Sequence, residues 1–280
     1  MRVRPLIAAA LFMAAATPAL AQRWRTLDAS RQLRDTAPLV VNVQYAAGKL
    51  ELRPAAAGDL YTMHLKYDAD RSEPVSRYDS LSHTLSLGLK SSHMNWNHGD
   101  QDAGAMQAQL SARVPLDLRF EVGAVEGDVQ LGGLRITDLS LKGGAAEVTL
   151  RFDAPNPVSM RTMKLDAGAE SVKVVKGVNA ATDRIRANVG VGALDLDFTG
   201  VLTHDLDVQA SVALGDFTLR LSPDVGVFVD AKTFLGDLSG SGLVKRGDGW
   251  YTPDYEKATR HVRVRLRAFV GGFKLRRTTD

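Results

Sequence analysis

The residue types best suited to chemistry gather in one polar stretch. His93, His98, Asp100 and Asp102 follow one another closely, and imidazole nitrogens and carboxylate oxygens are ligands that divalent cations accept. Their spacing matches no established metal site, so we predict no metal and no cofactor and interpret the stretch as a solvated loop. Trp96 lies in the same loop and is a candidate contact for a glycan or a protein, unless it packs down on a sheet.

A second irregular segment, Lys245–Thr259, carries two more candidate contact residues, Trp250 and Tyr251. It also contains Arg246–Gly247–Asp248, the order of residues found in a cell-attachment tripeptide. Asp248–Gly249 is a common tight-turn pair, so turn chemistry accounts for the tripeptide without any adhesive role.

Arginines alternate with apolar residues near the end of the chain. Arg263, Arg265 and Arg267 would share one face of a strand, and they form a basic stripe that could face anionic lipid headgroups or a polysaccharide. The alternative is that charge on a terminal strand prevents edge-to-edge pairing. We favour the second interpretation, because the end of a stack of strands needs protection.

Acidic residues recur beside glycines and at outward strand positions. They are Asp195, Asp197, Asp205, Asp207, Asp216, Asp230 and Asp237. The glycine-rich nonapeptide of calcium-binding β-rolls is absent, so we interpret these acids as solvated positions and turn caps. No serine, histidine and acid stand in a nucleophile-elbow context, and no glycine-rich loop opens a helix. The sequence therefore predicts a protein that is not an enzyme.

The first residues read as a secretory signal peptide, predicted over 1–21. Arg2 and Arg4 precede the apolar segment 6–16, and Ala19 and Ala21 supply the small residues before a cleavage site. Removing the two arginines from 35 basic residues leaves 33 against 32 acidic ones, which gives no electrostatic argument for nucleic acid. No other stretch is long and apolar enough to span a bilayer, so we expect a periplasmic or extracellular protein without a transmembrane segment after cleavage. The chain has no cysteine, which excludes disulfides and thiolate metal sites.

The elements that would carry these residues are strands that change phase. Apolar residues fall on even positions from Leu206 to Leu214 and on odd positions from Phe217 to Leu221. Since alternate side chains point to opposite faces, a chain that changes phase and keeps its apolar set buried must bend at the switch. Gly215 is the expected corner, because glycine tolerates the backbone angles that such bends need.

The same unit recurs along the chain. The first apolar residue after each switch falls at 129, 148, 172, 194, 217 and 238, which are near-constant intervals. We predict an all-β fold, a β-solenoid-like stack of short strands with glycine corners; an ordinary antiparallel sandwich is the alternative. The N-terminal β part would cover 22–104, opening on a helical turn or flexible lead-in over Gln22–Asp35 and ending in the polar loop 91–104. The repeated part, 105–280, would continue it.

Specific segments in the second half resemble a known family. Gly215–Leu219, Leu221–Val227 and the sequence KRGDGWYTPDYEKA before the last strand look like the toast-rack domain of bacterial envelope proteins. That domain occurs in adhesin-like proteins and is similar to the C-terminal domain of membrane regulators of the cell-wall-antibiotic response. The resemblance implies the toast-rack fold and an envelope location, and it brings no catalytic residues.

Together these observations predict an exported, non-catalytic binding or structural module of the envelope, adhesin-like, whose partner is an envelope polymer or an envelope protein. One alternative is a soluble periplasmic sensor that partners a membrane regulator of envelope stress. A second is a polysaccharide-active enzyme, which would require several of the aspartates to meet in one cleft.

Overall fold

The protein is built of strands, and the prediction of an all-β chain is confirmed. The computed structural model describes residues 23–91, 104–231, 234–238, 242–267 and 269–278. The strands before the polar loop are β1 (Trp24–Gln32), β2 (Leu39–Pro54), β3 (Asp59–Asp68), β4 (Ser72–Asp79) and β5 (Thr84–Ser91). Those from 104 to 221 are β6 (Ala105–Leu110), β7 (Pro115–Gln130), β8 (Arg135–Gly143), β9 (Glu147–Arg151), β10 (Met163–Val175), β11 (Arg184–Phe198) and β12 (Leu206–Leu221).

The C-terminal elements are shorter. The strands are β13 (Gly226–Asp230), β14 (Phe234–Asp237), β15 (Val244–Arg246), β16 (Gly249–Tyr251), β17 (His261–Arg267) and β18 (Phe269–Arg277). Two 3-10 helices, η1 (Gly177–Ala180) and η2 (Tyr255–Lys257), lie in connections. No helix in these ranges has the length and apolar character needed to cross a membrane.

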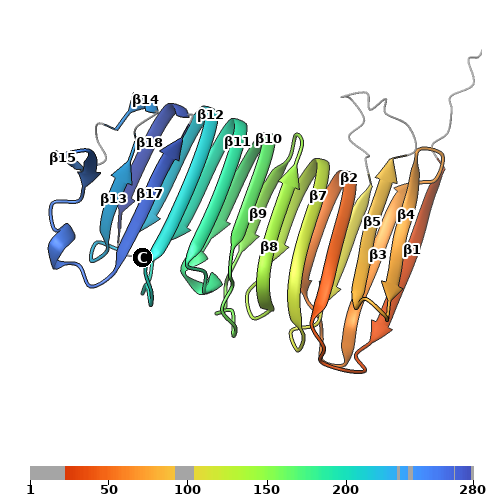
Figure 1. The fold of residues 1–280 in the computed structure, drawn as a ribbon. Helices are drawn as coiled ribbons and strands as arrows, with labels where there is room; N and C mark the ends of the chain where they lie inside the picture. Colours follow the sequence, from red (N-terminus) through yellow and green to blue (C-terminus); the bar gives the residue numbers. More distant parts are fainter. Residues whose placement is uncertain (1–22, 92–103, 232–233, 239–241, 268, 279–280) are drawn as a thin grey trace, which may run out of the picture.

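Each long strand is one layer of a parallel stack (Figure 1). We call the part before the glycine corner the leading half of a layer and the part after it the trailing half. In β12 the leading half pairs with β11 and β17, and the trailing half pairs with β11 and β18. The register is continuous, so Ile185 of β11 lies beside Val208 of β12 and Leu194 beside Phe217. Equivalent residues therefore form rows that run across the stack.

The core lies between the leading and trailing halves. Val208, Val212, Phe217 and Leu219 of β12 are all buried, on either side of the phase change. The rings of Phe217 and Phe273 in adjacent layers lie 5.2 Å apart, edge to face. The alternating apolar residues of both halves thus close one continuous core along the stack.

Glycine is required at several corners because adjacent layers approach closely there. Gly215 has φ +146°, and a Cβ at this position would lie 1.8 Å from the carbonyl oxygen of Gly192 in the neighbouring layer. Gly271 repeats the arrangement, since its Cβ would lie 1.7 Å from the carbonyl oxygen of Gly215. A side chain fits neither the backbone angle nor the space.

At the corner, one part of the predicted core is wrong. Leu214 belongs to the apolar series that the alternation assigns to the buried face, yet it is exposed, as are Val191 and Val270. In β12, Val212 and Phe217 are buried while both Ala213 and Leu214 face outward. The strand bends over these residues, so the last apolar residue before the glycine lies on the outer side of the bend.

The order of the layers differs from the order of the chain at the C-terminal end. β17 pairs with β12 on one side and with β13 on the other. The interpretation of Arg263, Arg265 and Arg267 as protection for a terminal strand is therefore wrong, because their strand is inside the stack. The stack ends instead at β13, β14 and the β15–β16 hairpin (Figure 1).

The N-terminal end is closed by antiparallel strands. β3 pairs with β6 and with β1, and β4 pairs with β5. The expectation of a helical turn or flexible lead-in over Gln22–Asp35 is wrong, since β1 occupies most of that segment. Its polar composition suits an edge strand with an exposed face, and this is why the apolar pattern does not reveal it.

Candidate functional site

The candidate contact residues of the sequence fall in two places. His93, Trp96 and His98 lie outside the described residues. Trp250 and Tyr251 lie on β16, which pairs with β13 so that Val229 faces Trp250 and Phe228 faces Tyr251. Because neighbours in a strand point to opposite sides, Trp250 packs half-buried against the core, whereas Tyr251 lies on the outer face.

Tyr251 belongs to a row of half-buried aromatic rings at the end of the stack. Ring centroids are 4.8 Å apart for Phe228 and Tyr251, 5.2 Å for Tyr251 and Tyr255, and 4.6 Å for Tyr255 and His261. A Cβ at Gly249 would lie 2.1 Å from the ring of Phe228, so this glycine makes room for the ring. The aromatic row is thus fixed by the hairpin and by η2.

Next to the aromatic row lies a surface that we call the arginine-rich face, formed by Arg184, Arg186, Arg263, Arg265 and Arg267. The leading halves of β11 and β17 flank β12 and carry these residues on their outer side. One row runs in register from Arg184 through Asp207, Arg263 and Phe228 to Tyr251. The arginines and the aromatic row therefore form one continuous outer surface.

Most of the charge on this face is not neutralised by neighbours. Arg265 pairs with Asp207, whose oxygens lie 3.2 and 3.3 Å from its two terminal nitrogens. The other four arginines are exposed and form no ion pair with any residue that the structure describes. Alternation within β17 predicts its three arginines as a stripe, whereas Arg184 and Arg186 cannot be assigned to it from the sequence, because only the register of β11 against β12 brings them alongside.

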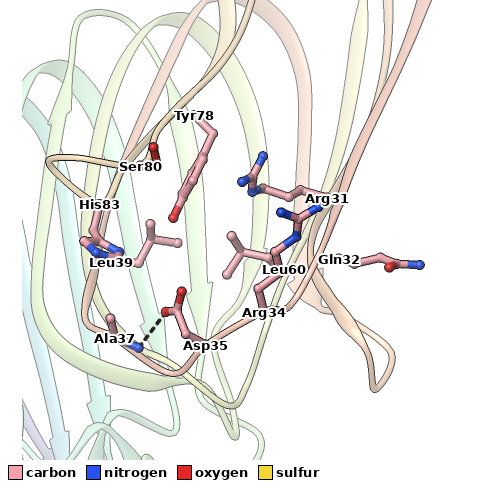
Figure 2. A pocket seen from close by; sticks show the side chains of 10 residues that line it. All are labelled: Arg31, Gln32, Arg34, Asp35, Ala37, Leu39, Leu60, Tyr78, Ser80 and His83. Carbon is pink, nitrogen blue, oxygen red and sulfur yellow. Dashed lines mark hydrogen bonds between the residues drawn. The ribbon is translucent and has the colours of Figure 1, made fainter.

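A cavity of about 220 Å³ lies at the opposite end of the stack (Figure 2). Leu39 and Leu60 are buried beneath it, and the guanidinium of Arg31 on β1 lies 4.1 Å from the ring centroid of Tyr78 on β4. This contact joins the two edge strands across the end of the core. Figure 2 shows the guanidinium groups of Arg31 and Arg34 on one side of the cavity and His83 on the other. Asp35 also lines the cavity, so its lining carries charges of both signs.

The aspartates that the sequence singles out line no common cleft among the described residues, although Glu51, Glu126, Asp128 and Glu147 line one cavity beside Lys49 and Arg151. Asp195 pairs with Arg220 of the next layer, Asp197 accepts hydrogen bonds from the backbone N–H and hydroxyl of Thr199, and Asp205 accepts one from the backbone N–H of His261. Within the described ranges, no three histidine, aspartate or glutamate side chains are placed to hold a metal ion. These acids connect layers and cap turns.

Two carboxyl groups, those of Asp79 and Asp166, have pKa values below their ordinary value. The pKa of Asp79 is lowered mainly by the backbone N–H of Leu81 and also by the Ser82 hydroxyl. For Asp166, burial acts to raise the pKa, but hydrogen bonds from Lys164 and Asn188 outweigh it and the pKa is lowered. These two carboxyl groups are thus held ionised, which suits structural pairing better than proton donation near neutral pH.

Comparison with known proteins identifies the domain type. The family model described as the N-terminal domain of toast_rack, DUF2154, matches residues 22–175, more than half of the chain. Comparison with the curated proteins finds no significant match.

Solved structures of low similarity were also found. One, titled as a candidate cell adhesion protein from Clostridium sporogenes, is 13% identical, with 91% of this chain and 100% of that chain covered and a TM-score of 0.42. Another, titled as a candidate adhesin from Bacteroides fragilis, is 10% identical, with 91% and 98% covered and a TM-score of 0.35. At these scores the two structures contribute nothing to an assignment of function.

Proposed function

The chain belongs to the toast-rack N-terminal domain family, and from that premise we propose that it is an exported, non-catalytic binding module of the bacterial envelope. In this proposal residues 1–21 are a signal peptide, and the mature chain works in the periplasm or outside the cell. Its parts 22–104 and 105–280 form one continuous β-solenoid of toast-rack type, which acts as a rigid scaffold for a binding surface.

The observation that carries the proposal is the unpaired charge of the arginine-rich face. Edge protection cannot explain these arginines, because β17 is paired on both sides. Guanidinium groups bind carboxylate and phosphate oxygens with two parallel hydrogen bonds, and the partner we propose is therefore an anionic component of the envelope. Tyr251 and Tyr255 at the end of the face add stacking surfaces beside the charges.

The test measures binding of the mature chain to isolated envelope fragments and to polygalacturonate, a defined polyanion, over a salt series. The variant is Arg263→Gln with Arg267→Gln. An arginine near an anionic surface contributes about 1 kcal/mol, so the double variant should bind about thirtyfold more weakly. Both residues are exposed and their backbones stay paired, so stability should change little.

The matched control is Arg25→Gln with Arg77→Gln, which removes the same charge from exposed positions at the other end of the stack. The control should keep wild-type affinity and the same decline of binding with salt. An equal loss in both double variants would show that only net charge matters. No binding of the wild type to either material at low salt would refute the proposal.

One observation favours the sensor alternative, namely the cavity lined by Arg31, Arg34, Tyr78 and His83. A small acidic ligand bound there would join β1 to β4 and stabilise the N-terminal end of the stack. Thermal shift of the wild type with a panel of small carboxylates and phosphates tests this, with Arg34→Gln as the variant that should lose the shift. A flat response across the panel would count against a sensor.

A further inference from the structure

Three exposed aliphatic side chains line up at the corner of neighbouring layers. Val191, Leu214 and Val270 expose 52%, 55% and 44% of their surface, and we call them the corner ridge. Val191 of β11 lies directly beside Leu214 of β12, and the pairing of Gly215 with Gly271 places Leu214 beside Val270 of β18. Since adjacent strands are about 4.8 Å apart, the ridge extends about 10 Å across the stack.

The fold does not require large residues at this row. Ala169 of β10 lies in the same row beside Val191, and it too is exposed. Alanine is therefore sufficient at the corner of β10, whereas β11, β12 and β18 carry valine or leucine in this row. The aliphatic groups lie on the outer side of the bend, where about half of the surface of each remains exposed.

The ridge borders the arginine-rich face. Arg267 precedes Val270 by three residues and Arg186 precedes Val191 by five, so at about 3.3 Å per residue the chain between them spans at most roughly 10 and 17 Å. Both arginines are exposed and have no acidic partner among the described residues. Apolar area and positive charge are the two contributions that favour binding to an anionic bilayer, and the ridge and these arginines supply both.

We propose that the corner ridge and the arginine-rich face dock this protein on an anionic phospholipid bilayer. The aliphatic side chains of Val191, Leu214 and Val270 enter the boundary between headgroups and acyl chains, and Arg186 and Arg267 donate hydrogen bonds to lipid phosphate oxygens. The inference rests on the proposed function and names its anionic partner. A second copy of the chain fits less well, since a stable dimer buries about 800 Å² on each partner and the ridge is three side chains on an outward bend.

The test is flotation of the mature chain with vesicles of phosphatidylglycerol and phosphatidylcholine, compared with vesicles of phosphatidylcholine alone. The ridge variant is Val191→Asp with Leu214→Asp, and it should bind the anionic vesicles at least tenfold more weakly. The control is Leu81→Asp with Val201→Asp, which adds the same two charges at aliphatic residues that are 94% and 82% exposed and lie away from the corner. It should bind as the wild type does.

A second measurement does not depend on the aspartate variants folding. Leu214→Trp and Val201→Trp each place an indole at one of these positions, and brominated phosphatidylcholine in the anionic vesicles quenches an indole that enters the acyl region. Relative to the wild type, whose three tryptophans set the background, added quenching at position 214 and none at position 201 is the expected result. Equal quenching at both, or at neither, would overturn the docking geometry.

The outcomes separate the two proposals. If the wild type binds polygalacturonate and envelope fragments but not anionic vesicles, the lipid inference fails and the proposed function stands. If it binds none of the three, both fail. If the ridge variant floats as well as the wild type, or if the wild type is a dimer that the ridge variant dissociates, the ridge does not contact lipid and the inference is overturned.

Discussion

Replacing Gly215 with alanine tests the contact between layers that defines the fold. The new Cβ would lie 1.8 Å from the carbonyl oxygen of Gly192, and a backbone φ of +146° disfavours any residue with a side chain. Neither partner of this contact is the end of a flexible side chain. Relief would require the layers to separate along the rows that pair β11 with β12.

The size of the effect follows from two contributions. A residue forced into a sparsely populated backbone region costs about 1–3 kcal/mol. Inserting a methyl group into a packed contact costs about 1–3 kcal/mol more. We therefore expect a loss of about 4 kcal/mol, which for a chain of this size corresponds to a decrease in Tm of about 8–16 °C.

The assay is thermal and urea unfolding followed by circular dichroism, with Gly133→Ala as the control. Gly133 also has a positive φ, +80°, but a Cβ there would meet no atom within 4 Å. The control should lose only the conformational part, about 1–2 kcal/mol. Equal losses in the two variants would refute the reasoning, because the approach of neighbouring layers would then contribute nothing.

Two further predictions concern hydrogen bonds. Asn156→Ala should cost about 2–4 kcal/mol in urea unfolding, because its buried amide accepts from the Ile136 N–H and donates to the carbonyls of Ile136 and Ala180. A loss no larger than that of Asn188→Ala, whose exposed amide donates to the half-buried Asp166, would contradict this. The pKa of Asp79 should lie below its ordinary value in an NMR titration. A lowered folded-state pKa gives stability that is present above the unfolded pKa and lost as pH falls through the folded value. Asp79→Asn should therefore reduce the loss of stability that acid causes below about pH 4. An unshifted pKa of the Asp79 carboxyl would contradict this.

The layers were predictable because the repeat is local. Alternation and a change of phase at Gly215 can both be read within one layer, and the core residues Val208, Val212, Phe217 and Leu219 follow from them. Leu214 could not be placed, because alternation does not say on which residue the bend begins. The position of β17 between β12 and β13 was also hidden, since strand order depends on pairing between segments distant in sequence.

The candidate surface was only partly visible in the sequence. Arg263, Arg265 and Arg267 stand out because they alternate within one strand, and Tyr251 stands out as an aromatic residue in an irregular segment. Their connection to Arg184 depends on the register of three strands. The corner ridge was the least predictable feature, since Val191 and Leu214 continue the pattern of the buried residues and only the bend exposes them.

The most direct test of binding through the arginine-rich face is arginine labelling with phenylglyoxal, read by mass spectrometry, on the mature chain free and bound to its isolated envelope. Binding through this face should protect Arg263 and Arg267 from labelling, while Arg25 and Arg77 should react at the same rate in both states. Unchanged labelling of Arg263 and Arg267 in the bound chain, with protection at Arg31 and Arg34 instead, would contradict it.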